Sequence, residues 1–378
     1  MSTLAARDRL KLFVLAGEAS GDRIGADLIT RLEARLPLDV AGVGGDEMSA
    51  AGVRSIFPMS DLAVMGISDV LRRLPLLLWR VEQVARYIAR TDPDVVVLID
   101  AQEFSRLVAK RLKAKRFAGA VLLYVAPSVW ARAPHRAKAY APLFAEILAV
   151  LPFEPKVLSD LGGPPTVYVG HPALAEAQLP TDGAADRVAL LPGSRDGEIR
   201  RHLPIMRAAA EALAARHPEL RFFIPSLASR ADDLRQRIAD WPVPVEIVAD
   251  RAARRALYAE TRLAVTSTGT ATLELALASV PTVGVYVMDP HQARVYARLG
   301  RPRASLPNII LNEDLIPEFI IEDSEPAEIV AAALELAGSA DLRRRQREGF
   351  ARLLQLMQDG EPGEGRHDPA ERILAHRK

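Results

Sequence analysis

The sequence predicts an α/β protein of two domains, each a parallel β-sheet covered by helices on both faces. The chain has 378 residues, which exceeds one ordinary hydrophobic core, and a composition that is 49% hydrophobic and 26% charged is typical of a globular protein. Short apolar runs alternate with longer helical patterns along both halves of the chain. These apolar runs are continuous rather than alternating, which indicates strands that are buried on both faces. Such strands belong to parallel sheets wrapped by helices, so two Rossmann-like domains are expected.

The elements follow from these patterns in order. In the first half the predicted strands are residues 12–16, 94–99, 121–125 and 147–151, and the predicted helices are residues 20–35, 68–90 and 104–116. In the second half the predicted strands are residues 188–191, 222–224, 245–248, 263–265 and 282–286. The boundary is placed in the stretch 173–186, where Pro180 and Gly183 interrupt the pattern. The predicted domains are residues 1–172 and 173–345, followed by a helical tail, residues 346–378.

Charge and composition exclude several classes of protein. Lys and Arg number 49 against 48 Asp and Glu, which argues against a dedicated nucleic-acid binder. The chain has no cysteine, so it has neither a disulfide framework nor thiolate chemistry, as fits a reducing compartment. Arg9 and Lys11 precede the first apolar run without a long apolar segment, which does not fit a signal peptide. The longest uncharged stretches, such as residues 275–288, are shorter than the ~20 residues of a spanning helix, so the chain is not expected to cross a membrane.

The most informative stretch is residues 263–274. An apolar strand is followed there by a turn and then by residues with high helix propensity, which predict the start of a helix. Four small or polar residues form the turn: Ser267, Thr268, Gly269 and Thr270. Gly269 lets a ligand approach the backbone, and the amides at the positive end of a helix dipole suit a phosphate. Glu274, one turn further along, could accept hydrogen bonds from the hydroxyls of a ribose. The stretch therefore suggests a nucleotide diphosphate site, although a helix cap beside a solvated acid explains these residues equally well.

The end of the first strand carries a different set of small and polar residues. The sequence there is Gly17-Glu18-Ala19-Ser20-Gly21-Asp22, and neither it nor Gly42-Val43-Gly44-Gly45 has the spacing G-x-G-x-x-G. A nicotinamide or flavin enzyme is therefore not expected. The turn could hold a sugar, or Ser20 could cap the helix while Gly21 packs against the sheet.

Two further strand ends carry charged residues. Asp100 follows the strand 94–99, where a carboxylate could act as a general base toward a hydroxyl. Alternatively, Asp100 and Glu103 have the spacing of a capping box. Arg195 ends the run 191–195, and an arginine there could bind phosphate oxygens with two hydrogen bonds, which favours a function.

Histidine placement gives no sign of a metal site. The seven histidines are scattered, and none lies four residues from another with an acid between them. His171, at the predicted domain junction, is interpreted as a hinge or packing residue.

Ten short motifs, taken in order, resemble those of lipid-A-disaccharide synthases. They are Gly17-Glu18-Ala19-Ser20-Gly21-Asp22, Gly42-Val43-Gly44-Gly45, Val64-Met65-Gly66-Ile67, Ile99-Asp100, Pro127-Ser128-Val129-Trp130, Leu151-Pro152-Phe153-Glu154, Val169-Gly170-His171, Pro192-Gly193-Ser194-Arg195 with Glu198-Ile199, Gly269-Thr270-Ala271-Thr272-Leu273-Glu274 and Leu306-Pro307-Asn308. Each motif is weak alone, but together they extend over about residues 12–318 and are specific.

The resemblance implies an inverting glycosyltransferase of the B type, with two sheets facing each other across a cleft. Such an enzyme joins UDP-2,3-diacylglucosamine to 2,3-diacylglucosamine 1-phosphate in lipid A and lipopolysaccharide biosynthesis, releases UDP and needs no cofactor. The family also implies a cytoplasmic protein that associates peripherally with the inner face of the cytoplasmic membrane. A homodimer is compatible with the sequence.

The resemblance also implies roles for particular residues. Asp100 would take the proton from the acceptor 6-hydroxyl, and Glu274 would hold the ribose. The uridine diphosphate would be held by Gly193, Ser194, Arg195, Ser267, Thr268, Gly269, Thr270 and Asn308. The acceptor or the cleft would involve Glu18, Ser20, Gly21, Met65, Gly66, Ser128, Trp130 and His171. These roles agree with the physical argument, since a helix N-terminus and an arginine can stabilise charge on a leaving diphosphate.

The chain departs from the family pattern at two motifs. Where the family commonly has Asp-Ala-Pro-Asp-Phe-Asn, this chain has Asp100-Ala101-Gln102-Glu103-Phe104-Ser105, and where it has Trp-Ala-Trp, this chain has Trp130-Ala131-Arg132. Both changes bear on the acyl-chain or phosphate preference of the acceptor. Two alternative functions are a UDP-sugar epimerase of the same fold and a non-enzymatic UDP-sugar-binding protein.

The stretch 65–80 predicts a contact with the membrane. Residues 74–79 are wholly apolar and are bracketed by Arg72, Arg73 and Arg80. A tryptophan beside arginines suits the headgroup boundary of an anionic leaflet, and the basic helix 106–116 would add attraction. A helix wedged between two domains would look similar. We expect residues 65–79 to line the entrance for the acyl chains and to dip into the inner leaflet.

Overall fold

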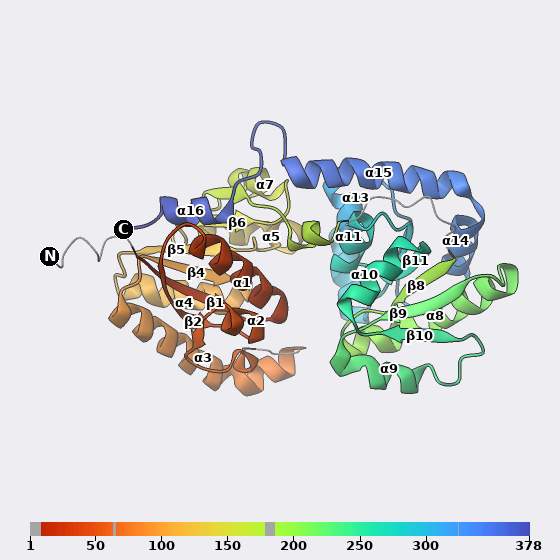
Figure 1. Cartoon of the computed structure of the whole chain (residues 1–378), viewed down its shortest axis with the longest axis horizontal. Helices are drawn as coiled ribbons and strands as arrows, with labels where there is room; N and C mark the ends of the chain where they lie inside the picture. The colour runs from red at the N-terminus through yellow and green to blue at the C-terminus, as the bar shows by residue number, and fades with distance from the viewer. Residues whose placement is uncertain (1–8, 63–65, 178–185, 324) are drawn as a thin grey trace. The chain divides into compact units, whose positions relative to one another are not determined.

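The computed structural model describes residues 9–62, 66–177, 186–323 and 325–378 (Figure 1). These residues form two compact units, which we call the first and the second domain. The first domain comprises residues 1–172 together with residues 359–378, and the second comprises residues 173–358. Of the predicted boundary stretch 173–186, residues 178–185 lie outside the described residues.

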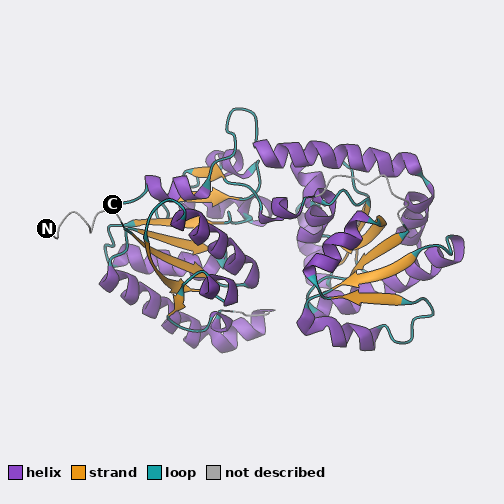
Figure 2. Cartoon of the chain, in the orientation of Figure 1, coloured by secondary structure: helices purple, strands orange, loops and turns teal. Residues whose placement is uncertain are grey.

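Each domain contains one wholly parallel sheet, which confirms the predicted fold class (Figure 2). The first sheet has the strand order β3-β2-β1-β4-β5-β6-β7. Its strands are β1 (Leu10–Ala16), β2 (Leu38–Val43), β3 (Arg54–Ser55), β4 (Val95–Ile99), β5 (Ala120–Tyr124), β6 (Glu146–Ala149) and β7 (Thr166–Tyr168). The helices of this domain are α1 (Ala19–Glu33), α2 (Asp46–Ala50), α3 (Gly66–Thr91), α4 (Gln102–Ala114), α5 (Val129–Arg132), α6 (Ala137–Tyr140), α7 (Glu154–Asp160) and α16 (Pro369–Ala375), with short 3-10 turns at Met59–Asp61 and Pro134–Arg136.

The second sheet has the strand order β10-β9-β8-β11-β12-β13. Its strands are β8 (Arg187–Leu191), β9 (Arg221–Pro225), β10 (Val245–Val248), β11 (Thr261–Ser267), β12 (Thr282–Val287) and β13 (Glu318–Ile321). The helices are α8 (Asp196–Arg216), α9 (Ala231–Arg237), α10 (Arg251–Ala259), α11 (Thr270–Leu277), α12 (Pro290–Arg298), α13 (Leu306–Leu311), α14 (Ala327–Gly338) and α15 (Ala340–Asp359), with 3-10 turns at Pro172–Glu176 and Ala228–Arg230.

Burial on both faces explains why the central strands are continuous apolar runs. Val96 and Leu98 of β4 pack against α3 and α4, whereas Ile99 lies against α1, so the strand needs apolar side chains on both sides. In the second domain Val265 of β11 faces α8 and α14, while its neighbour Ala264 packs toward α10 and α11. Parallel sheets with helices on both faces produce this pattern.

The last twenty residues belong to the first domain. Arg372 of α16 forms an ion pair with Glu146 of β6, whose carboxylate is buried. Asp368 caps α16 and also lies 3.1 Å from Arg35, which follows α1. His367 donates its backbone N–H to Tyr168 at 2.8 Å. The predicted tail 346–378 is therefore divided in the structure: residues 346–358 continue α15 in the second domain, and the rest completes the first.

Candidate functional site

In the second domain the turns after β8 and β11 come together, because the two strands are neighbours in the sheet. Gly193 has φ +101°, and a Cβ there would lie 2.6 Å from the carboxylate of Glu198 and 3.3 Å from Oγ of Ser267. Only glycine fits such a position without strain. The predicted donor-site residues Gly193 and Ser267 are thus adjacent, although they are far apart in the sequence.

Arg195 lies at the N-terminus of α8. Its guanidinium is 3.1 Å from Oε1 of Glu198, and the side chain is 75% exposed. The backbone N–H groups of Ser194 and Arg195 donate to Oε2 of the same carboxylate at 3.3 and 3.5 Å. Glu198 therefore orders the turn, while most of the arginine stays accessible. A cation beside the positive end of a helix is well placed for an anion.

The turn between β11 and α11 leaves its backbone accessible. Gly269 has φ +145°, and a Cβ at this position would meet no atom within 4 Å. Thr268 donates its backbone N–H to Val285 at 2.9 Å, and the hydroxyl of Thr272 donates to the carbonyl of Gly269 at 2.7 Å. These bonds fix the turn. The first N–H groups of an α-helix have no partner within the helix, so Thr270 and its neighbours present donors to an anion, with Glu274 one turn further along.

His202 is a residue of this region that the sequence did not single out. It is fully buried on α8, and its Nδ1–H donates to the carbonyl of Pro192 at 2.8 Å. Its Nε2 accepts the backbone N–H of Val287 at 3.0 Å. The neutral imidazole thus joins the end of β12 to the turn that carries Gly193 and Arg195. Burial lowers the pKa of His202, which keeps the ring neutral.

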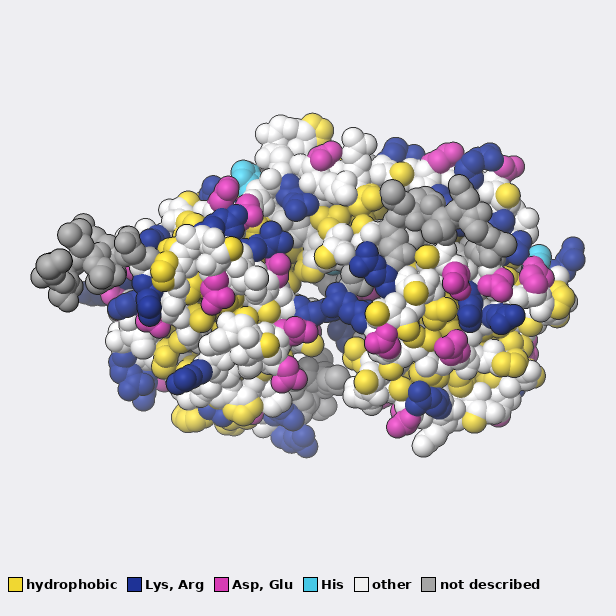
Figure 3. Space-filling view, in the orientation of Figure 1, with side chains coloured by type: hydrophobic (Ala, Val, Ile, Leu, Met, Phe, Trp, Pro, Cys, Tyr) yellow, Lys and Arg dark blue, Asp and Glu magenta, His cyan; other side chains and the backbone are white. Residues whose placement is uncertain are grey.

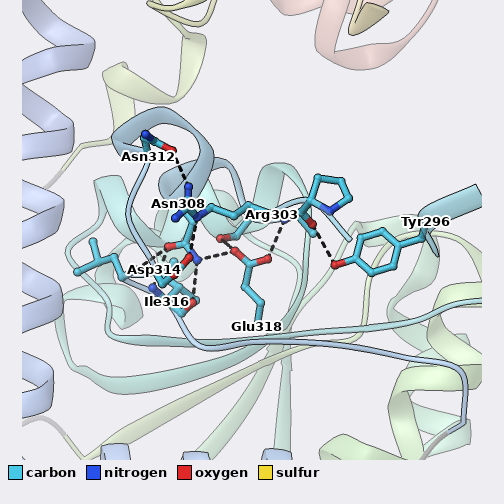
Figure 4. Close-up of polar contacts among 11 residues, drawn as sticks. Tyr296, Arg303, Asn308, Asn312, Asp314, Ile316 and Glu318 are labelled. Atoms are coloured by element: carbon cyan, nitrogen blue, oxygen red, sulfur yellow. Dashed lines mark hydrogen bonds and ion pairs between the residues drawn. The ribbon is translucent and has the colours of Figure 1, made fainter. Parts of the chain in front are cut away.

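Asn308 lies on α13 with its side chain buried, and Figure 4 shows this side chain pointing toward Ile316 and Glu318. The amide nitrogen donates to the carbonyl of Ile316 at 2.8 Å and to the carboxylate of Glu318, while Oδ1 accepts the N–H groups of Leu315 and Ile316 at 3.0 and 2.9 Å. These bonds use the two donors and two acceptors of an amide. The side chain of Asn308 thus holds the segment before β13, and its contact with the nucleotide stays a prediction.

In the first domain Asp100 follows β4 directly. Its backbone N–H donates to Tyr124 at 2.9 Å, and its backbone φ is +51°, in the left-handed region. Burial raises the pKa of the Asp100 carboxyl, and hydrogen bonds from Gln102 and the backbone of Ala101 act against this. The capping-box alternative does not hold, because α4 begins after Ala101 and the Glu103 carboxylate pairs with arginines.

The turn after β1 lies beside Asp100. A Cβ at Gly17 would be 2.7 Å from Cβ of Ala101, and one at Gly21 would be 3.4 Å from Ile99, so both glycines allow close packing. Glu18 is exposed at the start of α1 and, like the exposed Ser20, makes no side-chain cap. Their polar groups are thus accessible on the side of the sheet where Asp100 lies.

Three other predicted acceptor residues lie at the starts of helices. Ser128 is exposed before α5, which contains Trp130, and Gly66 is the first residue of α3. Met65 lies outside the described residues. Burial lowers the pKa of His171 to about 4, so this histidine is neutral at physiological pH.

Helix α3 is continuous through Pro75 and exposes part of its apolar surface. Leu74, Leu78 and Trp79 are 39%, 48% and 56% exposed, whereas Leu77 packs against the core of the first domain. On the face drawn in Figure 3, both basic and acidic side chains are scattered over each domain. Among the described residues there is no helix long and apolar enough to span a membrane, and no group of three or more potential metal ligands.

The family model and the similar relatives described below name the same protein family. The family model described as lipid-A-disaccharide synthetase matches residues 12–362. The chain is 36% identical over 380 residues to a lipid-A-disaccharide synthase of Nitrobacter hamburgensis, covering 97% of this chain and 95% of that protein. It is 38% identical over 362 residues to the enzyme of that name from Rhodopseudomonas palustris strain HaA2, covering 93% and 92%.

Solved structures support the fold at lower sequence identity. The calicheamicin glycosyltransferase CalG4 matches with a TM-score of 0.59 and 17% identity, covering 97% of this chain and 98% of that chain. A UDP-GlcNAc 2-epimerase from Neisseria meningitidis, bound to UDP-GlcNAc, matches with a TM-score of 0.60 and 10% identity, covering 92% and 99%. Transferases and epimerases therefore share this architecture, and the fold alone does not distinguish them.

Proposed function

The chain belongs to the lipid-A-disaccharide synthase family and is a UDP-sugar glycosyltransferase that forms the lipid A disaccharide, and from this premise we propose its substrates and the roles of its residues. The proposed donor is UDP-2,3-diacylglucosamine, and the proposed acceptor is 2,3-diacylglucosamine 1-phosphate. The products are the disaccharide 1-phosphate and UDP.

Asp100 is the proposed general base. Its carboxylate accepts the proton of the acceptor 6-hydroxyl while that oxygen attacks the anomeric carbon and the bond to UDP breaks, which inverts the configuration. Burial raises the pKa of Asp100, and a base becomes stronger as its pKa approaches the working pH. A partly buried carboxylate beside the turn at Gly17, where Glu18 and Ser20 are exposed, is the observation on which this proposal chiefly rests.

The second domain is proposed to bind the donor. Arg195 and the N-terminus of α11 stabilise the negative charge that develops on the departing diphosphate. Glu274 accepts hydrogen bonds from the ribose hydroxyls. His202 holds the turn after β8, and Asn308 holds the segment before β13 on the donor side.

The first domain is proposed to meet the lipid acceptor at a membrane surface, on the inner face of the cytoplasmic membrane. The exposed apolar face of α3 consists of Leu74, Pro75, Leu78 and Trp79. Arg80 stacks on Trp79 at 4.4 Å from the ring centroid while its guanidinium pairs with Asp61, so it supports the exposed indole from below. An exposed tryptophan suits the headgroup region.

The decisive experiment is to incubate the protein with both lipid substrates and to analyse the products by mass spectrometry. The proposed function predicts disaccharide 1-phosphate and an equal amount of UDP, and no UDP from the donor alone. A changed donor sugar without acceptor would indicate an epimerase. Binding of the donor without any product would indicate a UDP-sugar-binding protein.

A further inference from the structure

Gln102, the first residue of α4, connects the ends of two neighbouring strands. Its side-chain amide nitrogen lies 3.2 Å from the carbonyl oxygen of Val125, which follows β5, and 3.4 Å from Oδ1 of Asp100, which follows β4. One amide therefore donates to a backbone carbonyl and to the carboxylate that we propose as the base.

The backbone around this amide is held in an unfavourable conformation. Asp100, Ala101 and Val125 have φ values of +51°, +43° and +74°. The left-handed region is uncommon for residues other than glycine, and for a β-branched valine it is an outlier. Such conformations persist only where the surrounding contacts enforce them, and they concentrate at functional sites.

Several contacts hold the backbone of this turn. Asp100 donates its N–H to Tyr124, Val125 donates its N–H to Leu148, and the Ser105 hydroxyl donates to the carbonyl of Asp100 at 2.7 Å. Gln102 differs from these because it reaches the Asp100 carboxylate itself as well as the backbone.

The orientation of the Gln102 amide follows from its surroundings. The carbonyl of Val125 can only accept, so the nitrogen has to face it, and the same nitrogen then faces Asp100. Oε1 of Gln102 is enclosed and has no hydrogen-bond partner within the described part of the chain. Reversing the amide would place this oxygen against Val125 O and against an ionised carboxylate. Since the nitrogen can only donate, it favours the ionised form of Asp100.

We propose that Gln102 is a positioning residue that keeps the carboxylate of Asp100 ionised and oriented for proton transfer. This rests on the proposed role of Asp100 as the base. The family pattern commonly has proline at this place, and proline has no side-chain donor. In this chain the ionisation and the orientation of the Asp100 carboxylate therefore depend on a side chain that the common pattern lacks.

Of the charged groups near this turn, Glu103, Arg106 and Arg136 are paired with one another, while Glu18 is exposed at the start of α1. Glu103 of α4 forms ion pairs with Arg106 on the same helix and with Arg136 of the 3-10 turn Pro134–Arg136. The causes that shift the pKa of Asp100 are burial, the Gln102 amide and the backbone of Ala101. Loss of the amide is thus expected to act directly on the carboxylate.

The test is the pH dependence of kcat/KM, measured with both lipid substrates for wild type, Gln102→Leu and Gln102→Met. Both variants remove the donor and retain much of the volume. The acid limb of the profile is expected to move to higher pH by about one unit. At pH values on the acid side of the limb, kcat/KM is then reduced approximately tenfold, and at higher pH it is reduced less. UDP binding, which uses the second domain, is expected to stay unchanged.

Gln236→Leu serves as the matched control, because it makes the same substitution at an exposed glutamine of α9 in the second domain. Its acid limb is expected to coincide with that of wild type. An unmoved acid limb in folded Gln102→Leu and Gln102→Met would overturn the proposal for Gln102.

Asp100→Asn separates this proposal from the one on which it rests. If Asp100→Asn retains wild-type turnover, the assignment of the base fails, and the proposal for Gln102 fails with it. If Asp100→Asn is inactive while the Gln102 variants keep the wild-type profile, only the role of Gln102 is rejected.

Discussion

The carboxylate of Asp22 accepts a hydrogen bond of 2.7 Å from the backbone N–H of Gly45. It also accepts the N–H groups of Glu47 and Met48, at 3.0 and 3.1 Å, so that an acid on α1 caps the N-terminus of α2. Two motifs that are separate in the sequence thus form one structural unit at the ends of β1 and β2.

The first prediction follows from this contact. Gly45→Ala would place a Cβ 2.7 Å from the Asp22 carboxylate, which must move and weaken its backbone hydrogen bonds. Overpacking of this kind costs about 1–3 kcal/mol of unfolding free energy. Thermal unfolding should show a lower Tm than wild type. Gly338→Ala is the control, because a Cβ there meets no atom within 4 Å, and its Tm should not fall.

The second prediction concerns the proposed base. Asp100→Asn is expected to lower kcat by about 10²–10⁴-fold, because an amide cannot accept the proton at neutral pH. UDP affinity, measured by calorimetry, should not change. Wild-type turnover in this variant would show that Asp100 is not the base.

The third prediction concerns the leaving diphosphate. Arg195→Ala is expected to weaken UDP binding by about 10- to 100-fold and to slow turnover, since it removes charged hydrogen bonds to phosphate oxygens. Arg207→Ala, on the same helix, is the control, because Arg207 pairs with Glu211 and Asp240.

The Arg195 assay should be repeated in excess EDTA, where wild-type activity is expected to persist. Complete loss of activity that magnesium restores would contradict a mechanism in which Arg195 and α11 carry the charge stabilisation.

The fourth prediction concerns the exposed face of α3. The double substitution Leu78→Glu/Trp79→Glu is expected to reduce cosedimentation with anionic liposomes and to reduce activity on lipid acceptor, because charged residues oppose insertion into the headgroup region. Leu77 is unsuitable for this test, since it packs against the core. Leu227→Glu is a control, because it changes a 62% exposed leucine of the second domain. Binding by the double variant equal to that of wild type at low salt would reject the membrane contact.

The fifth prediction concerns pH and stability. Burial lowers the pKa of His202 and lowers that of His171 to about 4, so the unfolded chain binds more protons at these residues than the folded chain does. Stability is therefore lost as the pH falls through the unfolded value of about 6.5, at up to about 1.4 kcal/mol per pH unit for each histidine. The Tm should fall between pH 7 and pH 5.5, and the fall should be smaller in folded His171→Asn. A Tm that rises over this range would contradict the prediction.

The sequence predicts the strands that are buried on both faces, together with the edge strand β10, but it does not predict β2, β3, β7 and β13. The central strands β1, β4, β8 and β11 are buried on both faces, which forces a continuous apolar run. β3 consists only of Arg54 and Ser55, and all four residues of β13 are partly exposed, so neither has a distinctive pattern. Edge strands bury less surface, and their pairing depends on neighbours that are distant in the sequence.

The candidate site, too, can be predicted only in part from the sequence. Motifs at strand ends point to Asp100, Arg195 and the turn at Gly269, and their roles stay predictions. The contact between His202 and Val287 links residues 85 positions apart, and no local pattern predicts it. The internal hydrogen bonds of Asn308 are likewise visible only once α13 and β13 are placed in space.

The return of residues 359–378 to the first domain has a consequence for synthesis on the ribosome. Glu146 of β6 is made early, but its partner Arg372 follows 226 residues later. At 5–20 residues per second this separation corresponds to roughly 10–45 s, during which the entire second domain is translated. The nascent first domain has to persist for that time without the arginine that pairs with the Glu146 carboxylate in the complete domain. The domain that is translated first is thus the last to be completed, and a chain released too early keeps an unfinished surface that chaperones and proteases can recognise.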